Sequence, residues 1–292
     1  MPSKPEAGLP LRWLGATNHD RDAVGLTYVY PVVSRRAAGV SVGINLNPNQ
    51  ACNWGCVYCQ VPGLTRGSAP TIDLQQLNDE LRWMLDQIVN GDFMQQHVPG
   101  DSRRLNDIAF SGNGEPTSAS CFLQAVDMVG KLIDSFALSG KIKLILITNG
   151  SLVARPAVQQ ALQRMAALNG EVWFKFDRGL SRDFLQVNQV HLSPKIHLHH
   201  LAQAAVLCPT WVQSCFFAWD GQLPDDVSVA AYLDALRQTQ ERGVPLQGVL
   251  LYGLARPSQQ PQAHRLSPAP VQWMQQLAES IQALGLAVKL SA

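Results

Sequence analysis

Three cysteines, Cys52, Cys56 and Cys59, lie within eight positions of one another in the stretch NLNPNQACNWGCVYCQVPG (45–63). Cysteine thiolates are the usual protein ligands of iron–sulfur clusters. Three thiolates on a cluster of four irons leave one iron without a protein ligand, and an open position on a metal can accept a substrate or cofactor. The spacing therefore favours a [4Fe–4S] cluster with one open iron.

Two other interpretations of these cysteines are less favoured. Positions 52, 56 and 59 would share one face of a helix and could pack in a core, but Pro48 and Gly55 are typical of a loop. A structural zinc site normally takes four ligands, often as two pairs. Neither a second close cysteine pair nor a nearby histidine completes such a set.

The composition indicates a globular protein. Of the 292 residues, 46% are hydrophobic and 15% are charged, and the formal net charge is +1. Such a chain has no strong overall field to attract nucleic acid or a membrane surface. The sequence shows no apolar core of a signal peptide and no run of the roughly 18–20 apolar residues that a membrane span needs. We expect a cytoplasmic protein with no membrane association, in which the thiols stay reduced.

Strand-like apolar segments alternate with amphipathic helical segments about six times. Near-continuous apolar strands of this kind are typical of a parallel sheet covered by helices, where ligands bind beyond the carboxyl ends of the strands. The Cys loop and other polar loops follow those ends. The expected strands are 40–47, 105–112, 142–150, 170–177, 211–220 and 245–255, and the expected helices are 72–89, 120–136, 157–168, 195–207, 229–243 and 271–285.

The Cys loop resembles the C-x3-C-x-aromatic-C motif of the radical S-adenosylmethionine superfamily, with Tyr58 as the aromatic residue. The resemblance implies an α/β fold, a partial (βα)6 barrel with mostly parallel strands. It also implies an enzyme that uses one [4Fe–4S] cluster and S-adenosyl-L-methionine, with a one-electron donor such as a flavodoxin or ferredoxin. We expect an N-terminal arm (1–30) and a core domain (31–292), with the barrel at about 40–255 and a C-terminal helical extension at 256–292.

A second segment, FSGNGEPT (110–117), resembles the Gly-Gly-Glu-Pro segment of the same superfamily, which binds the amino group of the cofactor's methionine part. The resemblance implies that Glu115 places a carboxylate opposite that ammonium. A glycine-rich turn with a capping residue is the alternative. The candidate cofactor-binding residues here are Gly112, Asn113, Gly114, Glu115 and Pro116.

Two further polar segments carry candidate cofactor contacts. Thr148 and Asn149 could bond ribose or carboxylate oxygens, or could simply form an Asn-Gly turn. Asp177 and Asn188, in KFDRGLSRDFLQVNQ (175–189), match a superfamily segment that contacts the ribose, whereas Lys175 could be only a half-buried strand residue.

The segments 30–48 and 250–268 resemble a subgroup of iron–sulfur oxidoreductases similar to the tRNA wyosine-base synthetase. This resemblance implies a nucleobase or RNA substrate, and Arg35, Arg36 and Arg66 are candidate phosphate contacts beside the Cys loop. Enzymes of that type carry extra cysteines before the main motif, and this chain has none before Cys52. A peptide or protein substrate is therefore an alternative, and a non-catalytic metal-binding module is another.

The remaining cysteines and histidines give weaker signals. Six residues separate Cys208 from Cys215 in a pattern that does not provide a second cluster, and Cys121 opens a helix; we expect all three to pack in the fold. The histidines of HLSPKIHLHH (191–200) could line a pocket, but an amphipathic helix surface is the favoured interpretation. That interpretation applies to His197, His199 and His200.

Overall fold

The computed structural model describes residues 24–34 and 39–291. Arg35 and Arg36, and most of the expected N-terminal arm, lie outside the described residues. None of the described helices combines the length and the apolar character needed to cross a membrane.

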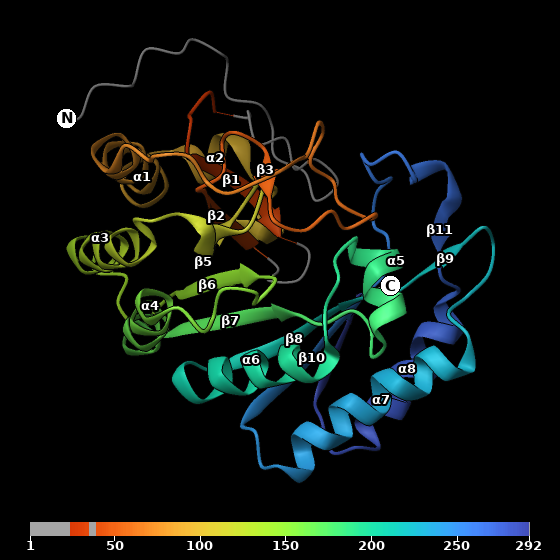
Figure 1. Ribbon diagram of the computed structural model, residues 1–292. Coiled ribbons are helices and arrows are strands. Elements are labelled where there is room, and N and C mark those ends of the chain that lie inside the picture. The colour runs from red at the N-terminus through yellow and green to blue at the C-terminus, as the bar shows by residue number, and fades with distance from the viewer. Residues whose placement is uncertain (1–23, 35–38, 292) are drawn as a thin grey trace.

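One curved sheet of eight strands forms the centre of the fold, in the order β1-β2-β5-β6-β7-β8-β10-β12 (Figure 1). The pairing is parallel from β2 to β12, and only β1 runs antiparallel to its neighbour. Because β1 and β12 each have only one neighbour in this sheet, the barrel is partial. The strands are β1 (Val29–Ser34), β2 (Gly39–Asn45), β5 (Leu105–Ser111), β6 (Lys143–Thr148), β7 (Gly170–Lys175), β8 (Thr210–Cys215), β10 (Leu246–Tyr252) and β12 (Val288–Ser291).

Helices run along the outside of this sheet and connect successive parallel strands (Figure 1). Their buried faces carry large apolar side chains, as expected for helices that cover a sheet. They are α1 (Leu74–Val89), α2 (Phe93–His97), α3 (Phe122–Ser135), α4 (Pro156–Ala167), α5 (Ser181–Asn188), α6 (Pro194–Leu207), α7 (Asp226–Glu241) and α8 (Val271–Gln282). Two pairs of short strands lie outside the main sheet: β3 (Ala51–Cys52) pairs with β4 (Thr65–Arg66), and β9 (Phe217–Trp219) pairs with β11 (Leu266–Pro268). The short 3-10 helices are η1 (Gly100–Ser102), η2 (Pro116–Ser118) and η3 (Ala263–Arg265).

The antiparallel edge strand β1 is held by a buried carboxylate. Glu80 on α1 is 2% exposed, and its oxygens accept hydrogen bonds from the backbone N–H groups of Thr27, Tyr28 and Val29. The side chain of Tyr30, on the same strand, lies across Gly43 of β2, where any Cβ would overlap the phenol ring. The glycine thus allows an aromatic side chain from the edge strand to cover the inner face of the sheet.

The partial barrel that the sequence predicts is confirmed, and each of the six expected strands corresponds to one parallel strand from β2 to β10. Several elements were not expected, among them the edge strand β1, the short helices α2 and α5, the short strands β3, β4 and β11, and the last strand β12. The segment after residue 256, expected to be helical, contains α8 but also β11 and β12, and β12 extends the main sheet beside β10.

Candidate active site

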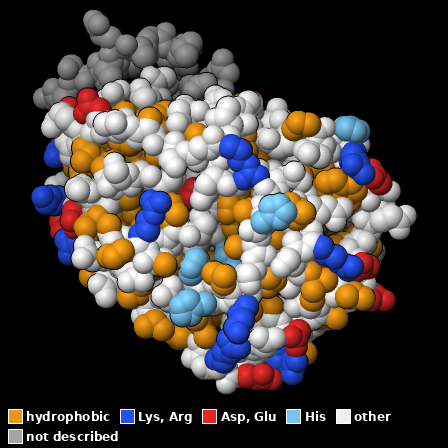
Figure 2. Space-filling model, in the orientation of Figure 1, with side chains coloured by type: hydrophobic (Ala, Val, Ile, Leu, Met, Phe, Trp, Pro, Cys, Tyr) orange, Lys and Arg blue, Asp and Glu red, His pale blue; other side chains and the backbone are white. Residues whose placement is uncertain are grey.

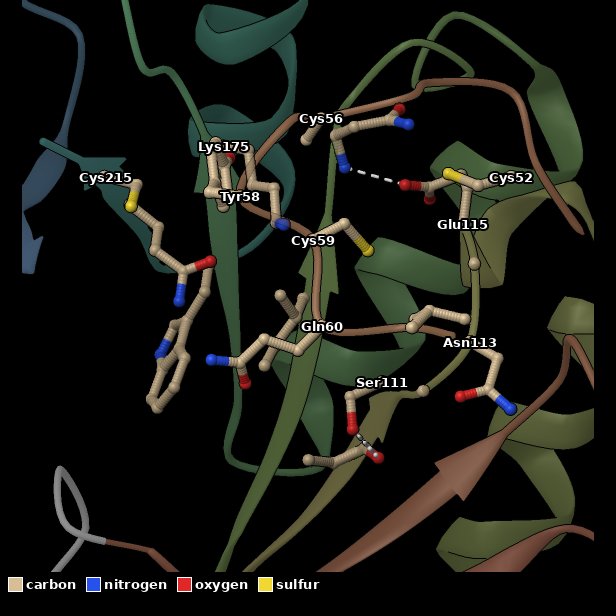
Figure 3. A pocket seen from close by; sticks show the side chains of 18 of the residues that line it. Cys52, Cys56, Tyr58, Cys59, Gln60, Ser111, Asn113, Glu115, Lys175 and Cys215 are labelled. Carbon is tan, nitrogen blue, oxygen red and sulfur yellow. Dashed lines mark hydrogen bonds between the residues drawn. The ribbon is translucent and has the colours of Figure 1, made fainter. Parts of the chain in front are cut away.

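A cavity of about 710 Å³ lies inside the barrel and opens at the carboxyl ends of the strands. Its wall includes all three cysteines of the Cys loop together with Tyr58. In Figure 3, the side chains of Cys52 and Cys59 point toward one open space, with Glu115 beside Cys52 and Lys175 beside Cys59. All three cysteines therefore line one cavity, although Cys56 is also buried at the edge of the hydrophobic core.

The Cys loop is fixed by contacts with α5 and α6. The backbone N–H groups of Gly55 and Val57 donate to the carbonyl oxygens of Asn188 (3.1 Å) and Val187 (2.8 Å) at the end of α5. The indole ring of Trp54 is buried against Phe184, with ring centroids 6.3 Å apart. The loop between Cys52 and Cys59 is thus held by an element that follows it by more than a hundred residues in the chain.

His197, on α6, completes the packing behind the loop. It is fully buried, its ring lies 5.5 Å from that of Trp54, and its Nε2 is 2.8 Å from the carbonyl oxygen of Lys175. Burial lowers its pKa to about 4, so the imidazole is neutral near pH 7. The expectation of a helix surface is wrong for His197, because α6 turns this side chain into the aromatic core.

Arg66 belongs to the scaffold of the Cys loop. Its guanidinium donates hydrogen bonds to the carbonyl oxygens of Asn53, at 2.6 Å, and Gln189. These bonds tie the two ends of the loop to the end of α5. The candidate role in phosphate binding therefore has no support from the position of Arg66.

Burial raises the pKa of the Cys52 thiol to about 11 and that of the Cys56 thiol to about 12. Both thiols thus hold their protons near pH 7, and a metal that binds them must displace those protons. In the described parts of the chain, no three His, Cys, Asp or Glu side chains are grouped closely enough to hold one metal ion. This spacing does not suit a single zinc ion, but a four-iron cluster takes each thiolate on a different iron.

Lys175 brings a positive charge to the thiols. It stands at the end of β7 and lines the cavity, and its ammonium lies 5.4 Å from the centroid of the Tyr58 ring. Burial works to lower its pKa, but the neighbouring Tyr252, Cys56 and Asp177 raise it overall, so the side chain stays charged. An ammonium in this place favours anionic thiolates at the cavity wall.

The glycine-rich segment after β5 approaches the Cys loop closely. At Gly114, a Cβ would overlap the carbonyl oxygen of Ala51, so only glycine fits there. Gly112 adopts φ +128°, a conformation that other residues rarely take. Gly112, Asn113, Gly114 and Glu115 all line the cavity, whereas Pro116 begins η2 behind its wall.

The carboxylate of Glu115 is engaged by four hydrogen bonds. Its Oε1 accepts from the backbone N–H of Thr117 (3.1 Å) and from the hydroxyls of Thr117 and Thr148 (both 2.6 Å). Its Oε2 accepts from the backbone N–H of Asn149 at 2.7 Å, the bond drawn beside Glu115 in Figure 3. Glu115 therefore joins the ends of β5 and β6, and it also lines the cavity. Asn149 also lines the cavity, but Thr148 does not.

Asp177 and Asn188 form a buried network behind the cysteines. Asp177 Oδ2 accepts hydrogen bonds from the Tyr58 hydroxyl and from Asn188 Nδ2 (2.7 Å), and Oδ1 accepts from the backbone N–H of Cys215 (2.8 Å). Asn188 Nδ2 also donates to Cys56 Sγ at 3.2 Å. Neither Asp177 nor Asn188 lines the cavity, so the expected ribose contact has no support from their positions.

A strap that sequence reasoning did not identify, residues 256–262 after β10, closes over the Cys loop. The carbonyl oxygen of Cys59 accepts from the backbone N–H of Gln259 (2.9 Å), the hydroxyl of Ser258 (3.1 Å) and the amide of Gln260 (3.2 Å). The Ser258 hydroxyl also lies 2.6 Å from the carbonyl oxygen of Val57. The strap therefore fixes the backbone of the third cysteine.

The other cysteines pack as expected. Cys208 is buried beside α6, and Cys121 is half-buried at the start of α3. Cys215 is buried too, but it also lines the cavity opposite the Cys loop. Cys215 lies two residues after Gln213 on β8, and alternate residues of a strand face the same side, so both side chains point into the barrel.

Comparisons with known proteins bear on this arrangement. No protein-family model matches the sequence. A UPF0026 protein of Helicobacter pylori (strain ATCC 700392 / 26695) is 25% identical over 165 residues, which are 54% of this chain and 48% of that protein. The chain thus spans about half the length of the curated relatives it matches.

Two solved structures share the architecture. The structure of TYW1 with a lysine-pyruvate adduct bound superposes with a TM-score of 0.53 at 11% identity, covering 86% of this chain and 74% of that one. HydG, a maturase of the [FeFe]-hydrogenase, gives a TM-score of 0.56 at 12% identity, covering 86% of this chain and 52% of that one. Both are radical S-adenosylmethionine enzymes.

The chain has the fold of the radical S-adenosylmethionine enzymes. The fold class predicted from the sequence is therefore confirmed, and the enzymes that share it use a [4Fe–4S] cluster and S-adenosylmethionine.

Proposed function

We propose that this protein is a radical S-adenosylmethionine enzyme that holds one [4Fe–4S] cluster through Cys52, Cys56 and Cys59. The observation that carries the proposal is the meeting of these three thiols with the glycine-rich edge at Glu115 in one cavity, at the carboxyl ends of parallel strands. The donor set suits the cluster because thiolates are its ligands. When bound, the cluster and S-adenosylmethionine would supply reductive cleavage of the cofactor and a 5′-deoxyadenosyl radical that abstracts hydrogen from a substrate.

The residues of the chain would bind the cluster and the cofactor, orient them and shield the reacting atoms. The three cysteines give up their protons to become ligands, and the Lys175 ammonium stabilises negative charge at that wall. The edge from Gly112 to Glu115 offers backbone groups and a carboxylate to the methionine part of the cofactor. The enclosed barrel interior keeps water and other hydrogen donors away from the reacting atoms.

Metal analysis combined with a test of S-adenosylmethionine cleavage separates this proposal from its rival, an iron–sulfur or other metal-binding module without catalysis. After anaerobic reconstitution, the proposed enzyme should contain about four irons and matching sulfide per chain. Replacing all three cysteines of the Cys loop by Ala should abolish that binding, whereas a matched double variant, Cys121→Ala with Cys208→Ala, should retain it. Full iron content in the triple variant, or stoichiometric zinc in the wild type, would refute the assignment.

The substrate is proposed from the sequence resemblance. A nucleobase, free or within RNA, is the first candidate, and a peptide or protein is the alternative. Figure 2 weighs against a large RNA surface on the face it shows, because basic and acidic side chains of the described residues are interspersed there. Of the arginines that suggested phosphate contacts, Arg66 is used by the scaffold, and Arg35 and Arg36 remain untested.

Stimulation of 5′-deoxyadenosine formation can decide between the two substrate classes. RNA fractions and protein fractions of a cell extract are added separately to the reconstituted enzyme. An RNA substrate should bind more weakly as salt rises, and Arg35→Ala with Arg36→Ala should weaken it further. Stimulation by protein fractions alone would exclude the RNA proposal. We also propose a cytoplasmic location and a flavodoxin or ferredoxin as electron donor.

A further inference from the structure

The cavity extends well below the level of the cysteines, and its deep part is polar. Gln213 stands two residues before Cys215 on β8, and Asp107 stands four residues before Ser111 on β5. At about 3.3 Å per residue, these positions lie about 7 Å and about 13 Å down their strands from the carboxyl ends at Cys215 and Ser111. Both side chains line the cavity. We call this deep part, lined by Ser41, Asp107, Trp173 and Gln213, the inner chamber.

Gln213 is buried, and its side-chain carbonyl oxygen is unpaired among the described residues. Only 2% of the residue is exposed. Leaving a buried amide oxygen unpaired typically costs about 1–3 kcal/mol. Groups of this kind, where they persist in a native fold, require an explanation such as a ligand.

Asp107 presents a second acceptor to the same chamber. It is 5% exposed, and in the described part of the chain its carboxylate has one hydrogen bond, from the Ser41 hydroxyl, on Oδ1. The other oxygen is left for a donor in the cavity. A buried carboxylate without a full set of donors destabilises the fold. Asp107 and Ser41 occupy paired positions on the adjacent strands β5 and β2, so this acceptor has a fixed place in the barrel wall.

The remaining walls limit what can enter. Ile145 and Ile147 of β6 are apolar, and Ala109 of β5 is small. The cavity volume of about 710 Å³ lies within the range of about 300–1,000 Å³ that is typical for a site of one ligand. By the proposed function, the same cavity must also hold the cluster and S-adenosylmethionine, which leaves little space for a substrate. Only a small substrate, or one narrow group of a larger substrate, can then reach the inner chamber.

We infer that the inner chamber is the substrate subsite, and that it takes a narrow or planar group bearing N–H donors, such as an amide, amidine or amino-substituted ring. Asp107 accepts from one N–H, and the Gln213 amide pairs with a second polar atom of the same group. The group would thereby be held below the level of the three cysteines, with the rest of the substrate extending toward the carboxyl ends of the strands. This inference rests on the proposed function for its role as a substrate site, but the binding chemistry does not require the cluster.

Fragment binding tests the inference with three probes of one shape: benzamidine and benzamide, which carry N–H donors, and benzoate, which carries acceptors only. Binding is measured by saturation-transfer NMR on apo-protein and on anaerobically reconstituted protein with S-adenosylmethionine. We expect saturable binding of the two nitrogen probes and not of benzoate. Gln213→Leu and Asp107→Asn should each weaken it by about five- to tenfold, whereas Gln247→Leu, an exposed glutamine on neighbouring β10, should not.

Each result decides the inference. Equal binding of benzoate, absence of binding by both nitrogen probes, or unchanged affinity in both chamber variants would overturn it. The Asp107→Asn change keeps the shape of the side chain, so it remains informative if Gln213→Leu perturbs folding, which a thermal unfolding midpoint reports. A protein that binds the nitrogen probes but holds no cluster would contradict the proposed function and leave the N–H site standing.

Discussion

The side-chain amide of Asn188 lies 3.2 Å from the sulfur of Cys56 and donates a hydrogen bond to it. The amide orientation is fixed by Asp177, because Asn188 Nδ2 also donates to that carboxylate at 2.7 Å and an amide oxygen there would be repelled. Asp177 is in turn held by Tyr58 and by the Cys215 backbone. One buried network therefore supports Cys56, a proposed cluster ligand, from behind the cavity wall.

We predict that Asn188→Leu lowers the reduction potential of the reconstituted cluster. A donor to a thiolate stabilises the more negative, reduced state, and hydrogen bonds to ligand sulfurs are among the factors that set such potentials. A loss of about tenfold in the reduction equilibrium corresponds to about 59 mV for one electron. Redox titration followed by electron paramagnetic resonance measures the shift. Gln186→Leu, an exposed change on the same helix, should leave the potential where it is, and an unmoved potential in Asn188→Leu would reject the tuning role.

Glu115→Ala should destabilise the apo-protein by about 2–4 kcal/mol. The change removes an acceptor shared by Thr117, Thr148 and Asn149, and leaves buried donors unpaired at about 1–3 kcal/mol each. Urea unfolding at pH 7 measures the loss. Glu115→Gln, which keeps one carbonyl oxygen, should recover part of it. If both variants unfold at the wild-type urea concentration, the carboxylate does not join the strand ends as the hydrogen bonds indicate.

Asp107→Asn should stabilise the apo-protein at pH 7 but not at pH 4. Burial raises the pKa of Asp107 from 3.8 to about 6 in the folded chain. Because the pKa is higher in the folded than in the unfolded chain, the protonated carboxyl contributes to the free energy of unfolding. This contribution is complete below about pH 4 and is lost as the pH rises through about 6, so the ionised carboxylate destabilises the folded protein at pH 7. The difference corresponds to about 3 kcal/mol at most. Urea unfolding of both proteins across pH 4–7 checks this, and a stability difference that does not change with pH would contradict it.

The strap should slow the loss of iron from the cluster. Ser258→Ala and Gln260→Ala each remove a donor to the backbone of the Cys loop, so the third cysteine becomes more mobile. We expect the reconstituted double variant to lose iron to a chelator several-fold faster than the wild type, measured by the decay of visible absorbance. Gln259→Ala is the matched control, since Gln259 is exposed and donates through its backbone. Equal rates in all three proteins would exclude this role.

The sequence predicts the fold well because its main signals are local. Near-continuous apolar strands followed by amphipathic helices specify the parallel units, and the spacing of Cys52, Cys56 and Cys59 lies within one loop. The strands β1 and β12 lack such a signal: β1 contains Pro31 and pairs antiparallel at an edge, and β12 has only four, mostly half-buried residues.

The parts of the site that the sequence does not predict arise from distant contacts. Asn188 reaches Cys56 across 132 positions, and Ser258 reaches Cys59 across 199. The motif that includes Asn188 predicted a ribose contact and not a bond to Cys56, and the resemblance of the segment around Ser258 gave no sign of its contact with the Cys loop. The acceptors Asp107 and Gln213 stand in strands that also carry other polar residues, such as Asn106 and Ser214, so no local signal set them apart as lining the inner chamber.

The most direct measurement of the central claim is the formation of 5′-deoxyadenosine. Wild-type protein, reconstituted anaerobically, is reduced with dithionite in the presence of S-adenosylmethionine, and the products are quantified by liquid chromatography. The account predicts methionine and 5′-deoxyadenosine in equal amounts from the wild type and from the Cys121→Ala, Cys208→Ala control, and neither product from the variant with Ala at 52, 56 and 59. A wild-type protein that carries its full four irons and yet leaves S-adenosylmethionine intact, or a triple variant that cleaves it at the wild-type rate, would contradict the account.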